Sequence, residues 1–508
     1  MASATLAAAL RRAPGRSKPV RRLLVGSWVA GEAAFCAWCH RHVRKANDAV
    51  PDAALPRPPP AERARLFQRC LDNVPAPGGT EGVRAFVSSW FFDAPCVDLH
   101  LEDVREWLAW GLFMRRWEDM DASERAEMQG YVTLLEHRCG LRFPPAAPAE
   151  GSSELGKANT DASATTMLRP CMKPTWESFC FGEQLVYLPL CFYALIALAD
   201  FAAGLMLRAH GFQLHRPQGS GLSYWLREES ACEARPPSDA GVDASARPLI
   251  VFAHGMGIGL LPYCLWFVPT LVDLQDRGHA GLLLLLRLPY VAMALGETSG
   301  VPPASQEVAE ALQEMLQRHR RSEAVSSAVL MGHSYGTFLL AQASRHIPGL
   351  FQGAVLLDPM CFMLHLGHIT HHFCYAPSLS SPQSLRQLVA RLVRMEMLVN
   401  VNMRRHFFWH QNCLWLEDLQ DGQLLGARPQ SCQDEHGGAL PARVLAVVAE
   451  HDSTMPCKEV RSYLQEQRAG TEGLVDLLLL PGAGHGAVLL PERLRVVRAK
   501  LERFLDAF

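Results

Sequence analysis

Residues 324–344, AVSSAVLMGHSYGTFLLAQAS, contain the pattern that decides the fold. A short apolar run ends in GHSYG at residues 332–336, and an apolar helical stretch follows directly. This succession of strand, sharp turn and helix fits the G-x-S-x-G pattern, in which the hydroxyl of Ser334 stands clear of the backbone. Glycine is required at Gly332 and Gly336 because side chains there would collide with neighbouring backbone.

Two later strands are predicted to end in residues that suit the same chemistry. The apolar run at 442–450 is followed by Asp452, and the run at 473–481 is followed by His485 between two glycines. A serine hydroxyl is a poor nucleophile until an imidazole takes its proton, and a buried carboxylate stabilises the imidazolium that forms. The chain order serine, aspartate, histidine is that of one hydrolase fold and differs from the orders of two protease folds.

An earlier strand is predicted at 247–253, and it runs directly into His254, Gly255, Met256 and Gly257. Small residues at this point let backbone N–H groups approach a substrate oxygen, as an oxyanion hole requires.

Further strands are predicted at 280–288 and 353–358, with a helix at 305–319 between them. This alternation of short apolar runs and helical patterns predicts a mostly parallel sheet with helices on both faces.

These motifs resemble the α/β-hydrolase superfamily of lipase- and esterase-like serine hydrolases over about residues 248–508. The resemblance implies an α/β-hydrolase fold with a helical cap insertion, here preceded by a mainly helical N-terminal region. It also implies that Ser334 is the nucleophile, His485 the general base and then acid, and Asp452 the orienting carboxylate. By the same resemblance, the backbone N–H groups of Met256 and Tyr335 would hold the oxyanion.

A second carboxylate is the alternative acid. Asp358 also follows a predicted strand, and some lipase-like members of the superfamily place the acid there. We prefer Asp452, because Asp358 is followed by Pro359 and can cap the loop instead.

The chain also divides by composition into segments. The predicted units are a basic N-terminal segment with a proline-rich break (1–60), a helical region (61–144), a linker (145–166), a segment with an apolar helix (167–230), the hydrolase core (248–359 and 439–508) and a cap (360–438).

Two segments suggest contact with a membrane. The first 31 residues hold six Lys or Arg and no acid, which suits a transit peptide, a disordered basic tail or a membrane-surface helix, and these alternatives stay open. The run 185–207 is apolar apart from Asp200 and is long enough to cross a hydrocarbon core, although such a helix can also be buried in a large protein. We expect membrane association, either spanning or in the membrane plane.

Composition excludes several classes of protein. The 49 Lys plus Arg balance 51 Asp plus Glu, and 49% of residues are hydrophobic, which disfavours a disordered chain and a nucleic-acid binder. The 15 scattered cysteines form no disulfide framework, so we expect reduced thiols in an intracellular protein, with organelle targeting left open.

The predicted cap bears on the substrate and on metals. Its amphipathic stretch at 388–401 and its aromatic residues at 407–409 suggest a hydrophobic substrate. Its histidines form two boxes similar to those of membrane di-iron desaturases, but those proteins need three, and here the order differs. We therefore expect no metal and no cofactor.

The predicted function is hydrolysis of a carboxylic ester with a hydrophobic or lipid acyl group, through an acyl-enzyme intermediate. Two alternatives stay open. One is an acyltransferase that uses the same triad, and the other is a membrane-associated binding protein that keeps the fold without turnover. No protein partner is predicted.

Overall fold

The computed structural model describes residues 18–48, 55–75, 77–146, 168–217, 222–228, 247–295, 302–319, 327–376, 384–419, 443–466 and 473–508. The first 17 residues, nearly all of the predicted linker and the last part of the predicted cap lie outside these ranges.

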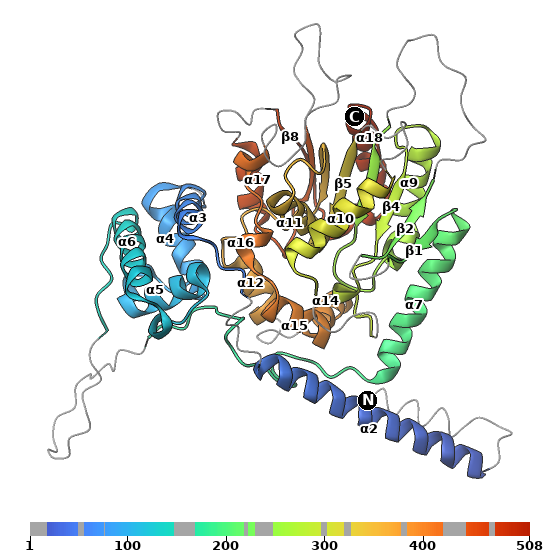
Figure 1. Ribbon diagram of the computed structural model, residues 1–508, viewed down its shortest axis with the longest axis horizontal. Helices are drawn as coiled ribbons and strands as arrows, with labels where there is room; N and C mark the ends of the chain where they lie inside the picture. The colour runs from blue at the N-terminus through green and yellow to red at the C-terminus, as the bar shows by residue number, and fades with distance from the viewer. Residues whose placement is uncertain are drawn as a thin grey trace, which may run out of the picture.

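An eight-stranded sheet forms the centre of the molecule, in the order β1-β2-β4-β3-β5-β6-β7-β8 (Figure 1). Its strands are β1 (Gln213–His215), β2 (Tyr224–Arg227), β3 (Leu249–Ala253), β4 (Leu283–Leu286), β5 (Ala328–His333), β6 (Gly353–Leu357), β7 (Val444–Ala449) and β8 (Val475–Leu480). β1 pairs antiparallel with β2 and β2 with β4, whereas all pairs from β4 to β8 are parallel. The predicted fold class, a mostly parallel sheet with helices around it, is confirmed.

The two antiparallel strands, β1 at the edge and β2 beside it, are absent from the predicted sheet. Their sequences, QLH and YWLR, are short and carry polar ends, so they lack the apolar run that marks the other six strands. They place residues 213–215 and 224–227 in the sheet, upstream of residue 248, where the predicted core begins.

The six parallel strands are apolar on both faces because helices cover both faces. On one face, Val251, Leu330 and Leu356 pack with α10, α11 and α17. On the other face, Phe252 and Met331 pack with α7, α9 and α18. These helices are α7 (Leu190–Ala209), α9 (Phe267–Asp276), α10 (Ser305–His319), α11 (Phe338–His346), α17 (Cys457–Gln465) and α18 (Pro491–Leu505), with the short α8 (Leu261–Cys264) before α9.

The insertion between β6 and β7 is helical where the structure describes it. It contains α12 (His368–Thr370), a π-helical turn (His371–Tyr375), α14 (Leu385–Met395), α15 (Met397–Arg405), α16 (Trp409–Asn412) and a 3₁₀ turn (Leu416–Leu419). Figure 1 shows α12 and α16 between the sheet and a group of N-terminal helices, with α15 below the sheet.

That N-terminal group comprises α3 (Pro60–Asp72), α4 (Gly79–Trp90), α5 (Leu101–Leu108), which runs on into a π-helical turn (Ala109–Phe113), and α6 (Ala122–Cys139). It is attached by polar and apolar contacts. Arg69 forms two hydrogen bonds with Asp418, and Trp90 donates one to the carbonyl of His365 at 2.8 Å. Its buried side chains are continuous with the apolar cluster on one face of the sheet.

A long helix, α2 (Lys18–Asp48), crosses the lower end of α7 (Figure 1). Glu32 of α2 accepts hydrogen bonds from the hydroxyl of Tyr187 at 2.6 Å and from the backbone N–H of Leu190 at 3.1 Å. The first acid of the chain therefore caps the start of α7, which begins directly after Pro189.

Candidate active site

Ser334 occupies a strained turn between β5 and α11. Its φ is +52°, which is unusual for a residue other than glycine. A Cβ at Gly336 would lie 2.1 Å from the carbonyl oxygen of Ala253, and one at Gly332 would lie 2.7 Å from the carbonyl carbon of Gly336. Gly332 is therefore needed because the turn after β5 folds back onto it, and Gly336 because this turn packs against the end of β3. This is the steric reason that the sequence pattern suggests.

The three residues of the predicted triad lie together. His485 Nε2 is 2.9 Å from Ser334 Oγ, and His485 Nδ1 is 2.7 Å from Asp452 Oδ2. Asp452 is buried and also accepts the backbone N–H of Thr454 at 2.7 Å. With a proton on Nδ1 held by the carboxylate, Nε2 is free to take the proton of the serine hydroxyl.

Asp358, the alternative acid, lies close to this group but makes different contacts. Its Oδ2 accepts the backbone N–H of Gly486 at 2.7 Å, and His333 Nε2 lies 3.5 Å from the same oxygen. Although full burial alone would raise its pKa, contact with His333 and His485 lowers it below the ordinary value. Asp358 thus holds the backbone after His485, while Asp452 contacts the imidazole.

The loop after β3 approaches Ser334 closely. A Cβ at Gly255 would lie 3.0 Å from both His333 Nδ1 and Ser334 Cβ, so only glycine fits without a shift. Gly257 has a φ of +142° and donates its N–H to the carbonyl of Val291 at 3.0 Å. The loop therefore carries Met256 past the serine, and Tyr335 follows the serine in the first turn of the next helix.

His254 fixes the base of this loop. Its Nδ1 lies 2.7 Å from the carbonyl oxygen of Gly255, and its Nε2 accepts the backbone N–H of Leu288 at 3.1 Å. Complete burial lowers its pKa to about 4, so the ring is neutral at neutral pH. Through these contacts His254 fixes the conformation of the loop after β3.

A buried polar chain that the sequence analysis misses joins the loop after β3 to the turn after β8. The hydroxyl of Tyr263 accepts the N–H of Gly255 at 2.8 Å and lies 2.7 Å from His333 Nδ1. His333 in turn faces Asp358, which holds Gly486. The place of His333 inside G-x-S-x-G is a signal for this role, whereas nothing in the sequence around Tyr263 marks it.

Two cavities lie near the elbow, although neither is lined by Ser334 or His485. One, of about 140 Å³, lies between α7 and the loop after β3 and is lined by Ile196, His254 and Ile258 among others. The other, of about 720 Å³, is lined by Tyr290 and Tyr335 and by polar side chains of α11 and the cap. Both adjoin residues next to Ser334 in space or in sequence, so they are the candidate spaces for substrate groups.

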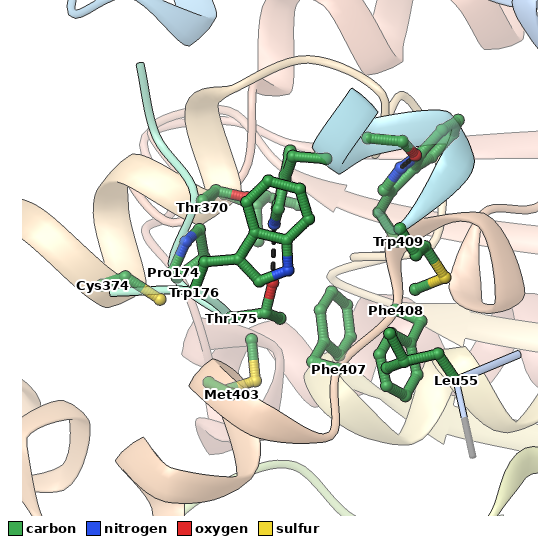
Figure 2. Close-up of a pocket in the computed structure, with 14 residues that line it drawn as sticks. Leu55, Pro174, Thr175, Trp176, Thr370, Cys374, Met403, Phe407, Phe408 and Trp409 are labelled. Atoms are coloured by element: carbon green, nitrogen blue, oxygen red, sulfur yellow. Dashed lines mark hydrogen bonds between the residues drawn. The ribbon is translucent and has the colours of Figure 1, made fainter. Parts of the chain in front are cut away.

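Two aromatic residues of the cap, Phe407 and Phe408, line the larger cavity and also reach a second, smaller pocket. Phe407, Phe408 and Trp409 line a small pocket of about 30 Å³ together with Trp110 and Trp176 (Figure 2). Trp409 donates a hydrogen bond to the carbonyl of Gly111 at 2.9 Å, which ties the cap to the N-terminal helices. These rings serve mainly as the core between the two parts.

The cap histidines do not converge. His365 Nε2 bonds the carbonyl of Asn73 at 2.7 Å, and His410 Nε2 bonds that of Pro56 at 2.9 Å. Within the described ranges, the one group of three side chains that brings ligand atoms together is Asp358, Asp452 and His485, with those atoms within 4.8 Å of one another.

Both the sequence and the fold are similar to those of known proteins. The model of the alpha/beta hydrolase family matches residues 250–499, and no curated protein sequence matches the chain. Similar solved structures include a membrane phospholipase A described as a bacterial virulence factor, with 13% identity, 62% of this chain and 93% of that chain covered, and a TM-score of 0.38. They also include an esterase from Mycobacterium marinum (16% identity, 63% and 90% covered, TM-score 0.38) and one from Pyrococcus furiosus (11% identity, 59% and 95% covered, TM-score 0.36). The family match shows that residues 250–499 form a domain of the α/β-hydrolase family.

Proposed function

We propose that the protein is a serine hydrolase that cleaves a carboxylic ester of a hydrophobic acyl group. The observation that carries this proposal is the unbroken chain of hydrogen-bond distances from Ser334 Oγ through His485 to Asp452. A serine on a strained turn has little structural reason to contact an imidazole that a buried carboxylate orients.

The reaction would proceed in two halves. His485 Nε2 takes the proton of Ser334 as its oxygen attacks the carbonyl carbon of the ester. The N–H groups of Met256 and Tyr335 hold the resulting oxyanion, and the C–O bond to the alcohol breaks as His485 returns the proton to the leaving oxygen. Water then attacks the acyl-enzyme with His485 as base, which releases the acid and restores Ser334.

The surroundings of the elbow support an acyl group without charge. Met256 and Ile258 pack with Ile196, Met293 and Val399, so the loop after β3 faces an apolar cluster built from α7 and α15. The cavity of about 140 Å³ adjoins this cluster. Asp200 and Arg287 line one part of this cavity, and its apolar residues, such as Ile196 and Leu260, suit a hydrocarbon chain. The larger cavity beyond Tyr335 has room for the leaving alcohol.

We also propose that the protein is intracellular and membrane-associated. Thirteen cysteines among the described residues are free thiols, as in a reducing compartment. α7 has a mean hydropathy of 2.1 over an 18-residue window of which 28% is buried, which supports contact with lipid.

The test is steady-state hydrolysis of p-nitrophenyl esters with acyl chains of increasing length, together with acylglycerols. Wild-type protein should hydrolyse the longer chains with higher kcat/KM, and Ser334→Ala should be inactive. Ser123→Ala, an exposed serine of α6, is the matched control and should behave as wild type. Equal rates for wild type and Ser334→Ala would overturn the proposal, as would inactivity of the wild type on every ester.

A further inference from the structure

α7 is apolar on both of its faces, although only one face is packed. Ile196, Ala203 and Leu207 are buried, whereas the other face exposes Leu195, Leu198, Phe201 and Leu205 by 52–63%. A surface helix of a water-soluble protein carries polar residues on its outer face. The outer face of α7 therefore has the character of an interaction surface.

The one charge within the apolar part of α7 does not belong to that outer face. Asp200 accepts a hydrogen bond from Arg287 at 2.8 Å, which directs its carboxylate toward β4. At the C-terminal end, the guanidinium of Arg208 lies 5.2 Å from the ring of Trp225. The side chain of Asp200 is 48% exposed, but it lies on the side of α7 that faces Arg287 and the cavity of about 140 Å³. The face formed by Leu195, Leu198, Phe201 and Leu205 therefore carries no charge, as expected of a surface that meets hydrocarbon.

Neighbouring elements extend the apolar surface. Leu265 and Trp266 are 57% and 52% exposed and directly follow α8, which packs against α7. Tryptophan is enriched where proteins meet the boundary between lipid headgroups and acyl chains. On α2, Leu23 and Val29 are 70% and 59% exposed, and α2 is attached to α7 through the cap that Glu32 provides.

The charge of α2 fits an anionic surface. Its sequence contains six Lys or Arg residues, which lie toward the two ends of the helix, and only two acids. One of these acids is Glu32, which accepts the backbone N–H of Leu190 at the start of α7. Basic residues that flank an exposed apolar stretch are attracted to acidic lipid headgroups while the apolar side chains enter the boundary beneath them. The combination favours a bilayer over a protein partner.

The packing of the inner face argues against a spanning helix. The hydroxyl of Tyr193 donates to the buried Glu396 of the cap at 2.6 Å, and a Cβ at Gly204 would lie 3.3 Å from the Trp225 side chain of β2. α7 ends at Ala209, and β1 of the central sheet begins at Gln213. Crossing a bilayer would strip the helix from these contacts, whereas lying in the membrane plane preserves them.

We propose that the outer face of α7, with Leu265, Trp266 and the apolar residues of α2, docks in the plane of an anionic lipid bilayer. One helix width then separates the lipid from the cavity between α7 and the loop after β3. The docking surface rests on residues outside the proposed catalytic group. Its role in bringing acyl chains to that cavity rests on the proposed function.

The test uses the full chain with preformed vesicles of equal parts phosphatidylcholine and phosphatidylserine, and measures the fraction of protein that sediments with them. The double variant Leu198→Glu, Phe201→Glu should bind at least about tenfold more weakly than wild type, because two charges would enter the headgroup boundary. Val496→Glu is the matched control, since Val496 is an equally exposed apolar residue (51%) on α18. It should bind as wild type does.

In the sedimentation experiment, three results would overturn the proposal: no binding by the wild type, equal binding by the double variant, or equal loss in the α18 control. Light scattering without lipid should give a monomer for every variant. A wild-type dimer that the double variant dissociates would assign the face to a second copy of the chain and so contradict the proposal. Hydrolysis of the water-soluble ester p-nitrophenyl acetate, measured in parallel, should be equal in wild type and double variant, so a failure of the proposed chemistry is read separately from a failure of docking.

Discussion

His485 Nε2 lies 2.9 Å from Ser334 Oγ although 151 residues separate the two in the chain. The parallel order of β5, β6, β7 and β8 produces this contact, because the carboxyl ends of parallel strands meet at one edge of a sheet. The loops after these strands therefore bring Ser334, Asp358, Asp452 and His485 to the same place.

The two carboxylates should differ in their effect on rate. Asp452→Asn removes the charge that orients the Nδ1 proton of His485, and we expect kcat/KM on a p-nitrophenyl ester to fall by about 10³ to 10⁴-fold. Asp358→Asn keeps an oxygen that can accept the Gly486 N–H, so its loss should stay below about 10²-fold. The reverse ranking would make Asp358 the acid.

The glycine after Tyr335 should be indispensable for folding. Gly336→Ala would place a Cβ 2.1 Å from the Ala253 carbonyl oxygen, so we expect a loss of about 4 kcal/mol or more in the free energy of unfolding, or no soluble protein. Gly130→Ala on α6 is the matched control, since its Cβ would meet no atom within 4 Å, and it should gain up to about 1 kcal/mol. Thermal unfolding measures both, and a stable Gly336→Ala protein would show that the described elbow is wrong.

The buried hydrogen-bonded side chains around Tyr263 should affect kcat, because they hold the loop after β3 in place. Tyr263→Phe leaves the Gly255 N–H without its acceptor, which should cost about 1–3 kcal/mol of stability and lower kcat by about 10 to 10²-fold with little change in KM. Tyr131→Phe removes a comparable hydroxyl contact, 2.6 Å from Glu127 in the N-terminal helices, and should leave kcat unchanged. If both variants changed stability alone, Tyr263 would have no part in positioning the loop.

The contact between the cap and the N-terminal helices should weaken in acid. Burial lowers the pKa of His365 to about 4 from an ordinary 6.5. Between these values the unfolded chain binds a proton on His365 that the folded chain does not bind, so the free energy of unfolding is retained above pH 6.5 and falls as the pH drops toward 4. The slope from this residue is at most about 1.4 kcal/mol per pH unit.

His365→Gln isolates that contribution, because glutamine can still donate to the Asn73 carbonyl but does not titrate. Denaturant unfolding at several pH values between 4 and 7 should show a smaller slope in the variant. Parallel curves for the two proteins would contradict the assignment of this acid sensitivity to His365.

The sequence predicts the parts of this molecule that depend on local pattern. Six strands can be found as apolar runs, because strands that are buried on both faces require apolar side chains. The elbow can be found from Gly332 and Gly336, because steric crowding there admits only glycine. β1 has only three residues, and β2 begins with Tyr224 and ends with Arg227, so neither strand carries an apolar run. The contacts of Tyr263 with Gly255 and His333 join three separate segments of the chain, so no local sequence pattern predicts them.

The apolar run at 185–207 shows that hydropathy alone does not predict which face of a helix is packed. Hydropathy predicts a helix that suits lipid or a buried core, and the structure has α7 meeting the sheet with one face while the other stays open. A pattern that is apolar all round cannot distinguish these faces, because both carry the same residue types. Only the position of Trp225 and Glu396 against the inner face separates them.

The most direct test of the central claim is covalent labelling of the purified protein with a fluorophosphonate, followed by mass spectrometry of its peptides. We expect one modified residue, Ser334, no labelling of Ser334→Ala, and greatly slowed labelling of His485→Ala, because the serine oxygen needs the imidazole to lose its proton. Equal labelling of the wild type and Ser334→Ala, or modification at another residue alone, would contradict the account.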